Sequence, residues 1–193
     1  GAWAAAGAAI ADDLRARGFA VEVIDLPTGE AAKRLTEIEN AARALATLRA
    51  ERREPLIAIG GGALGDAAGL LAALWLRGVP VIHVPTTLVA QIDSAIGGKT
   101  AVDLPEGKNL LGAFHQPAAV IIDIGLLRSL PERQRRAALG EAVKMALLGD
   151  ELLLGLLERH GEAIARGDDA AFESGAVAEL VERALWAKVE VVL

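Results

Sequence analysis

The chain has 193 residues, enough for one large domain, or one domain and part of another, around a buried core. Hydrophobic residues make up 53% and charged residues 24% of the chain, a balance that excludes a disordered protein. The net charge of −6 argues against a nucleic-acid binder, because clustered lysine and arginine hold phosphate backbones.

The first half of the chain alternates helices with strands, a pattern typical of parallel βαβ units. In chain order we expect a helix, a strand, a helix, a buried strand, an apolar helix and another buried strand, at residues 3–17, 19–26, 30–49, 55–59, 64–76 and 79–84. The apolar face of the second helix is formed by Leu35, Ile38, Ala42, Leu45 and Leu48.

The pattern changes after the last of these strands. Residues 95–109 are rich in glycine and predict a loop or a β-excursion, and residues 119–123 predict a further strand. From Pro131 onward the sequence predicts helices at residues 132–148, 150–159 and 175–192. We therefore expect an α/β fold in which a Rossmann-like nucleotide-binding domain, residues 1–128, precedes the start of an all-helical domain, residues 129–193.

The composition also bears on the compartment. The chain has no cysteine, which excludes a disulfide framework and fits a reducing cytoplasm. The longest apolar run, residues 67–76, is too short for a bilayer, which takes about 20 residues to span. Asp12 and Asp13 interrupt the early alanine-rich segment, so no signal peptide is visible. We expect a cytoplasmic protein without membrane or nucleic-acid partners.

A glycine motif follows the first buried strand and opens the apolar helix. Gly60, Gly62 and Gly65 fit the pattern G-x-G-x-x-G, in which the backbone approaches a pyrophosphate and the N–H groups of the helix start attract its charge. The alternative is a tight strand-to-helix turn without a ligand. The motif alone therefore favours a nucleotide site without establishing one.

The acidic residue of an ordinary dinucleotide site is missing, because nothing acidic lies between Asp66 and Asp93. The next strand ends instead at Thr86 and Thr87. A nucleotide here would be held by these hydroxyls and by the turn at residues 29–30. The two threonines are also suited to capping a helix, and the two functions are compatible.

Several cations accompany glycine turns in an otherwise apolar region. Lys99 follows two glycines after Asp93, Lys108 follows another glycine and precedes Asn109, and Arg77 lies nearby. Lysines presented in this way can bind an anionic ligand. The alternative is that all three cations are solvated surface charges.

The helical half contributes further candidates. Glu141 and Lys144 share one face of a helix at a spacing of three residues, as a metal-binding carboxylate beside a cation or as a surface ion pair. Lys188 lies among valines, either with a snorkelling side chain or with a tuned pKa at a site. The three histidines complete no metal site: we expect His83 in the core, His160 at a helix end, and a ligand contact at most for His115.

Taken together, these motifs resemble the 3-dehydroquinate synthase family of sugar-phosphate cyclases. The resemblance runs from about Leu26 to the end and rests on eight motifs in order. They lie at residues 60–66, 77–78, 85–87, 91–94, 97–100, 107–109, 112–114 and 140–144.

The resemblance implies a role for each matching residue. Contacts with NAD are implied for Thr28, Gly29, Glu30, Lys33, Gly61, Gly62, Ala63, Leu64, Gly65, Asp66, Thr86, Thr87, Lys99, Lys108, Leu126, Leu127, Arg128 and Ser129. Substrate-site roles are implied for Arg77, Asp93, Lys99, Asn109, Lys144 and Lys188. Glu141 matches the family's metal-binding glutamate.

The resemblance also implies the chemistry. Enzymes of this family are homodimers that bind NAD and a divalent metal, zinc or cobalt. They convert 3-deoxy-D-arabino-heptulosonate 7-phosphate (DAHP) to 3-dehydroquinate and phosphate in the shikimate pathway. NAD is oxidised and regenerated within each cycle, phosphate is eliminated, and an intramolecular aldol step closes the ring.

The chain departs from the family pattern in three respects. Thr28 stands where Asp is commoner and Ser129 where Thr is commoner, and both retain a polar side chain. The two metal-binding histidines of the family, with a nearby Arg and Asn, match positions beyond Leu193. From the resemblance we expect an internal fragment that does not hold the metal well or catalyse the reaction by itself.

Three other functions fit parts of the pattern. A sister cyclase, of the 2-deoxy-scyllo-inosose or epi-valiolone synthase type, would differ around residues 96–100, which here keep the Gly-Gly-Lys motif. A metal- and NAD-dependent alcohol or glycerol dehydrogenase would accumulate NADH. A non-catalytic nucleotide-binding fragment would catalyse neither cyclisation nor alcohol oxidation.

Overall fold

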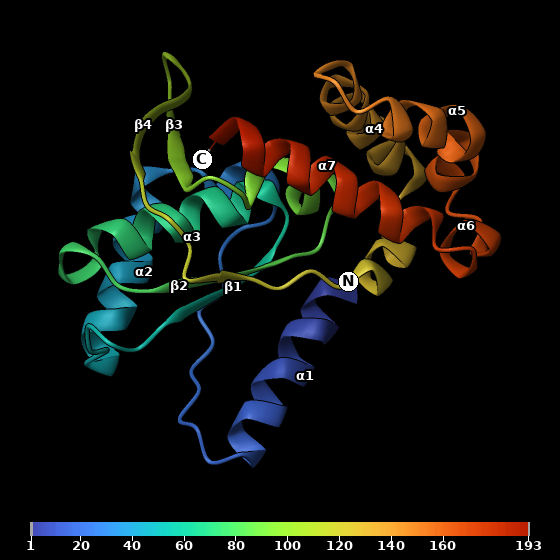
Figure 1. Ribbon diagram of the computed structural model, residues 1–193. Helices are drawn as coiled ribbons and strands as arrows, with labels where there is room; N and C mark the ends of the chain where they lie inside the picture. The colour runs from blue at the N-terminus through green and yellow to red at the C-terminus, as the bar shows by residue number, and fades with distance from the viewer. Residues whose placement is uncertain (1, 193) are drawn as a thin grey trace.

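The fold is built on a small parallel sheet, as the computed structural model of residues 2–192 shows (Figure 1). Strands β1 (Leu56–Gly60), β2 (Val81–Pro85) and β5 (Ala119–Val120) lie in the order β1-β2-β5. All neighbours are parallel, with Leu56 opposite Val81 and Ile82 opposite Ala119. Strands β1 and β2 are the buried strands that the apolar runs predict, and β5 covers two residues of the strand predicted at 119–123. The expected α/β fold is confirmed.

Helices lie on both sides of this sheet. Helix α3 (Gly62–Leu74) runs along one side and α1 (Ala2–Ala16) lies on the other (Figure 1). Helix α2 (Leu35–Leu48) packs against α3, where its Ile38 and Leu45 meet Leu70 of α3 in one buried cluster. The short 3₁₀ turn η2 (Trp75–Arg77) ends α3 and leads the chain back toward β2.

Two of the predicted elements are wrong in part. Residues 19–26 form no strand, because no strand of the described chain lies beside them to share backbone hydrogen bonds, and Phe19 and Val23 are exposed. The helix expected from residue 30 begins only at Leu35, after the 3₁₀ turn η1 (Gly29–Ala32). Its buried stripe is therefore Ile38, Ala41 and Leu45, and Leu35 and Leu48 are exposed.

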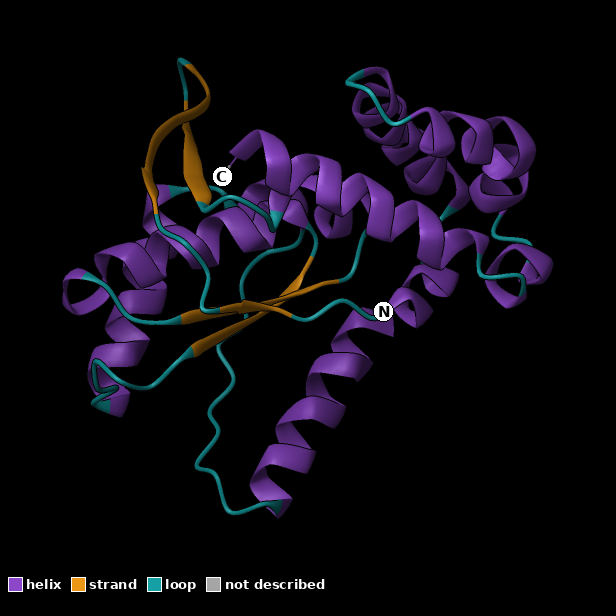
Figure 2. Ribbon diagram, in the orientation of Figure 1, coloured by secondary structure: helices purple, strands orange, loops and turns teal. Residues whose placement is uncertain are grey.

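Residues 90–114 form a turn and a hairpin, which is the expected β-excursion. A π-helical turn, η3 (Ala90–Ser94), follows β2. Strands β3 (Lys99–Leu104) and β4 (Gly107–Phe114) then pair antiparallel and project from the body of the molecule (Figures 1 and 2). The hairpin approaches α3 closely, since a Cβ at Gly69 would lie 2.4 Å from Cγ2 of Thr100.

The remaining chain is helical, as predicted. A 3₁₀ segment, η4 (Ile124–Ser129), leads into four helices, and the third of these is a short one that the sequence does not predict. They are α4 (Glu132–Leu147), α5 (Glu151–Arg166), α6 (Asp169–Glu173) and α7 (Ala176–Val192). Helix α5 extends beyond the predicted residue 159 to Arg166, and Gly167 follows it in a left-handed conformation that caps its C-terminus.

One hydrophobic cluster joins these helices to the segment after β2. Leu88 and Ile92 are buried in it together with Leu153 of α5 and Leu180 of α7. The predicted domain boundary after residue 128 falls inside η4. The same hydrophobic cluster contains residues from both sides of it, so the boundary stays a prediction. Among residues 2–192, no helix combines the length and the apolar character needed to cross a membrane.

A buried arginine fastens η4 to the helical part. Arg135 of α4 is 6% exposed, and its guanidinium donates to the main-chain carbonyls of Leu127, Leu130, Ala165 and Arg166. The donors therefore bridge η4 and the C-terminal end of α5. A Cβ at Gly167 would lie 2.4 Å from Nη2 of Arg135, so glycine is needed there.

Candidate functional site

The predicted nucleotide turn lies where β1 and β2 end side by side. The amide of Thr86 donates to the carbonyl of Gly60 at 2.9 Å, which fixes the two strand ends together. Thr87 accepts from the amide of Ala90 at 3.3 Å, so it does cap the turn that follows. No side chain caps the N-terminus of α3, and its first N–H groups remain available to an anion.

Close neighbours leave little room for side chains at two glycines of this turn. A Cβ at Gly62 would lie 2.7 Å from Oγ of Ser94, and one at Gly61 would lie 3.1 Å from Cγ2 of Thr87. The Oγ of Ser94 is buried and has no hydrogen-bond partner among the described residues. A buried polar atom without a partner is costly, so a ligand at the N-terminus of α3 would satisfy it. The turn therefore fits the pyrophosphate of NAD.

A buried lysine lies at the C-terminal end of η1. Lys33 is 5% exposed, and its Nζ lies 2.6 Å from Oδ2 of Asp66 on α3. The same Nζ donates to Oδ1 of Asn109 on β4. We call these three residues the Lys33 network.

The hairpin supplies a further acid to this region. The carboxylate of Asp103 accepts from the main-chain N–H of Asn109 at 2.8 Å. The main-chain N–H of Asp103 donates to the carbonyl of Lys33, also at 2.8 Å. The hydrogen bond from Asn109 lowers the pKa of Asp103, whereas burial raises the pKa of Asp66 against the opposing charge of Lys33. Lys108 lies 3.5 Å from Glu30, and both side chains are exposed.

A second group of predicted residues meets where α4 and α7 pack on η3. Nζ of Lys188 lies 2.7 Å from Oδ1 of Asp93, with little of either side chain exposed. Lys144 donates to Glu141, and this carboxylate raises the pKa of the lysine, as does Asp93. We call Asp93, Glu141, Lys144 and Lys188 the helical cluster.

These residues do not form a metal site. No group of three or more histidine, cysteine, aspartate or glutamate side chains converges anywhere in residues 2–192. Glu141 is one oxygen ligand next to a lysine, whereas a catalytic zinc takes three protein ligands. The described residues therefore do not fit a bound metal by themselves.

Other predicted residues lie apart from both groups. Arg77 follows the C-terminal end of α3, which spans about 20 Å from its N-terminus. Lys99 begins β3 with an exposed side chain. Arg128 lies over the ring of Phe172, 4.4 Å from its centroid, so the turn at residues 126–129 would offer mainly its backbone to a nucleotide.

The histidines take structural positions. His83 is buried in β2, and burial, with a smaller contribution from His115, lowers its pKa. Nε2 of His115 lies 2.8 Å from the carbonyl oxygen of Val79. The core position expected for His83 is confirmed, and both imidazoles have structural surroundings.

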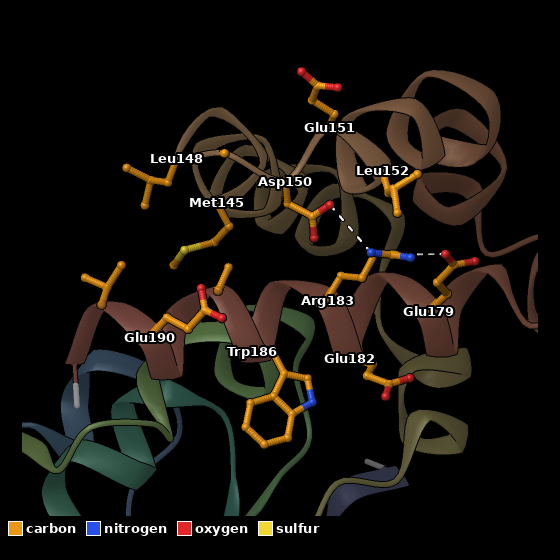
Figure 3. Close-up of a pocket in the computed structure, with 13 residues that line it drawn as sticks. Met145, Leu148, Asp150, Glu151, Leu152, Glu179, Glu182, Arg183, Trp186 and Glu190 are labelled. Atoms are coloured by element: carbon orange, nitrogen blue, oxygen red, sulfur yellow. Dashed lines mark hydrogen bonds and ion pairs between the residues drawn. The ribbon is translucent and has the colours of Figure 1, made fainter.

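A groove on the described surface lies away from all of these residues. It measures about 760 Å³ and separates the α4–α5 turn from α7, where Arg183 lies between Asp150 and Glu179 (Figure 3). Its lining includes Trp186 and Glu190 but no residue predicted from the sequence as a site residue. Asp103 is the contrary case, since it lies in the site but the sequence gives no distinct signal for it. Ser94 belongs to the motif at residues 91–94, but the sequence alone assigns it no role.

Comparison with known proteins places this geometry in a family. The family model for the N-terminal part of 3-dehydroquinate synthase matches residues 23–137. A 3-dehydroquinate synthase from Symbiobacterium thermophilum is 44% identical over 160 residues, which cover 83% of this chain and 45% of that protein. The chain thus spans less than half the length of this curated relative.

Solved structures agree with that result. A 2-epi-5-epi-valiolone synthase from Streptomyces hygroscopicus, with NAD⁺ and Zn²⁺ bound, aligns with a TM-score of 0.87 and 34% identity over 95% of this chain and 51% of that one. A 2-deoxy-scyllo-inosose synthase complexed with carbaglucose-6-phosphate, NAD⁺ and Co²⁺ aligns at 0.68 and 36%, over 72% of this chain and 39% of that one. The glycine turn, the Lys33 network and the helical cluster are thus parts of a chain that belongs to the 3-dehydroquinate synthase family.

Proposed function

We propose that the complete protein containing this chain is a 3-dehydroquinate synthase, which converts DAHP to 3-dehydroquinate and phosphate. The observation that carries the proposal is the uncapped N-terminus of α3 beside the buried, unpartnered Oγ of Ser94, with two groups of cations on neighbouring elements. This arrangement suits a nucleotide and a substrate with two anionic groups. The family membership of the chain supports the same reaction.

The glycine turn would hold NAD. The backbone of residues 61–66 would bind the pyrophosphate, and Ser94 would donate to it from η3. Thr86, Thr87 and the turns at residues 28–33 and 126–129 would line the rest of the cofactor. NAD supplies a transient hydride acceptor, and since the hydride returns within the cycle, no net oxidation results.

The substrate would lie between the two groups of cations. Arg77 and Lys99, which lie apart from both groups, are proposed as substrate contacts on the sequence motifs alone. Asn109 would contact the substrate from the hairpin, and Asp93, Lys144 and Lys188 from the helical cluster. In the structure Lys188 is paired with Asp93, and Lys144 with Glu141. A phosphate or carboxylate would compete for the ammonium groups, and the charge-assisted hydrogen bonds would orient one flexible substrate through several steps.

We further propose that Glu141 is one ligand of a divalent metal, zinc or cobalt, and that the protein is a cytoplasmic homodimer. Zinc and cobalt occur in the solved cyclases that the chain resembles. The other ligands would have to come from residues outside those described here. No reaction step is assigned to the metal.

A sister cyclase is the alternative with a specific observation behind it, because the two cyclases above align closely with the chain. The higher identity to a 3-dehydroquinate synthase and the intact motif at residues 96–100 favour the proposed reaction. Solved dehydrogenases that align with the chain are 17–19% identical and share only its fold.

The test uses the complete protein with DAHP and a catalytic amount of NAD. We expect phosphate release without net NADH, and a loss of about 10²–10³-fold in kcat for Lys144→Ala, the effect of removing one preorganised charge. Arg43→Ala removes an exposed cation paired with Glu39 and is the matched control. NADH formed in step with substrate consumed would support a dehydrogenase, and phosphate release only from another sugar phosphate would support a sister cyclase.

A further inference from the structure

The Lys33 network fixes a side-chain amide through a closed ring of hydrogen bonds. Nζ of Lys33 donates to Oδ1 of Asn109, the main-chain N–H of Asn109 donates to Oδ1 of Asp103, and the main-chain N–H of Asp103 donates to the carbonyl of Lys33. Asn109 also has a left-handed backbone, with φ of 57°. Its main chain and its side-chain oxygen are therefore both held in place.

The chemistry of the lysine decides which way the amide faces. An ammonium group can only donate hydrogen bonds, so it must meet the oxygen of Asn109 and never the nitrogen. The Nδ2 group is consequently turned away from Lys33. It has no acceptor among the hydrogen bonds of residues 2–192, and the side chain of Asn109 is largely exposed.

The ammonium of Lys33 is enclosed, and two of its three N–H donors are already taken. Its side chain is 6% exposed and is already bonded to Asp66 and Asn109. Asp66 lies in the first turns of α3, directly after the glycine turn. Lys33 thus connects the element that would hold NAD with the hairpin that would face the substrate.

We propose that Lys33 is a positioning residue that sets the amide of Asn109 so that its Nδ2 group donates to an anionic oxygen of the substrate. This inference rests on the proposed function for the identity of the substrate, and it replaces a direct NAD contact of the Lys33 side chain. The anionic oxygen belongs to a phosphate or to a carboxylate.

The chain offers a direct measurement, because it contains only two asparagines, Asn40 and Asn109. Asn40 is exposed on α2 and provides an internal reference. In the chain labelled with ¹⁵N-asparagine, NMR spectra show two side-chain amide pairs, and Asn40→Asp assigns them. We expect the Asn109 pair to lie apart from the Asn40 pair and to move on titration with inorganic phosphate, with acetate, or with both.

Variants test whether Lys33 sets this amide. We expect Lys33→Met to move the Asn109 pair toward the Asn40 position and to weaken anion binding about 10-fold, as for the loss of one oriented hydrogen bond. Lys33→Arg keeps a donor and should retain most of the wild-type shift. Arg34→Met removes the neighbouring exposed cation and is the control. We expect NAD affinity to change by less than about twofold in all three, because Asp66 and Asn109 already hold the ammonium.

Each contrary result overturns the inference. If the side-chain amide signals of Asn40 and Asn109 coincide in the wild type, the Asn109 amide is not held. This result does not depend on the folding of any variant. An unchanged Asn109 pair in Lys33→Met, or a large loss of NAD affinity in that variant, would make Lys33 a cofactor contact. A wild-type amide that responds to neither anion would remove the substrate assignment. None of these measurements requires turnover, so failure of the complete protein to release phosphate would count against the proposed reaction alone.

Discussion

The Lys33 network and the helical cluster differ in how many of their charged groups are buried and hydrogen-bonded within the protein. The Lys33 network is buried around its lysine, and its three members are joined to one another and to Asp103. The helical cluster consists of two separate ion pairs, and about half of the Lys144 side chain is exposed. The first group is fixed before any ligand arrives, whereas the second has cations that a ligand can take from their acids.

This difference indicates which group maintains the fold and which adapts to the ligand. A buried charge whose partner is removed has no water to replace it, so its loss is felt in the free energy of unfolding. An exposed pair is already hydrated, and its loss is felt mainly when a ligand needs the charge. Stability measurements on the chain can therefore separate the two groups without any assay of activity.

The largest expected effect is at the buried carboxylate. Asp66→Ala leaves the Lys33 ammonium with Asn109 alone, and we expect it to lower the free energy of unfolding by about 2–3 kcal/mol. Urea denaturation of the chain measures this, with Asp12→Ala on the exposed face of α1 as control. Adding Lys33→Met to Asp66→Ala should recover part of the loss. A change no larger than that of the control would contradict a structural role for the network.

A smaller effect is expected in the helical cluster. Lys144→Met removes a pair whose side chains are 52% and 36% exposed, and we expect the free energy of unfolding to change by less than about 1 kcal/mol. The same urea experiment measures it. A loss as large as that of Asp66→Ala would show that the cluster, too, supports the fold, and the distinction drawn above would be wrong.

The smallest effect concerns pH. Because burial raises the pKa of Asp66, the folded chain binds its proton more readily than the unfolded chain does. This contribution to stability is present at low pH and is lost as the pH rises from the unfolded value of 3.8 through the higher folded pKa. We expect the wild type to gain stability relative to Asp66→Asn as the pH falls from 7 toward 4. The opposite slope in parallel thermal melts would show that Lys33 outweighs burial.

Much of the fold follows from the sequence because its signals are local. Apolar β-branched runs predict β1 and β2, and the glycine motif predicts the turn into α3. The strand expected at residues 19–26 fails because a strand depends on a neighbour, which no local pattern describes. The predicted start of α2 at residue 30 is wrong for a related reason. Lys33, at the end of the η1 turn, is held by partners that are distant in the sequence.

The site is predictable in its residues and less so in its connections. The motifs identify Lys33, Asp66 and Asn109, but the sequence assigns two of them to the cofactor and does not join them, because they are 33 and 76 positions apart from the lysine. Asp103 is found only from three-dimensional contacts. The motif at residues 91–94 contains Ser94, but its unpartnered hydroxyl is seen only in the structure. The roles assigned to the site residues stay predictions until the variants above are measured.

Arg135 has a consequence for how related sequences can diverge. Its four acceptors are main-chain carbonyls, so the side chains of Leu127, Leu130, Ala165 and Arg166 can change without removing a bond. In a set of aligned relatives we therefore expect none of these four positions to covary with position 135. The trace of the contact should instead appear as a glycine at position 167 wherever arginine occupies position 135, because any Cβ there meets the guanidinium.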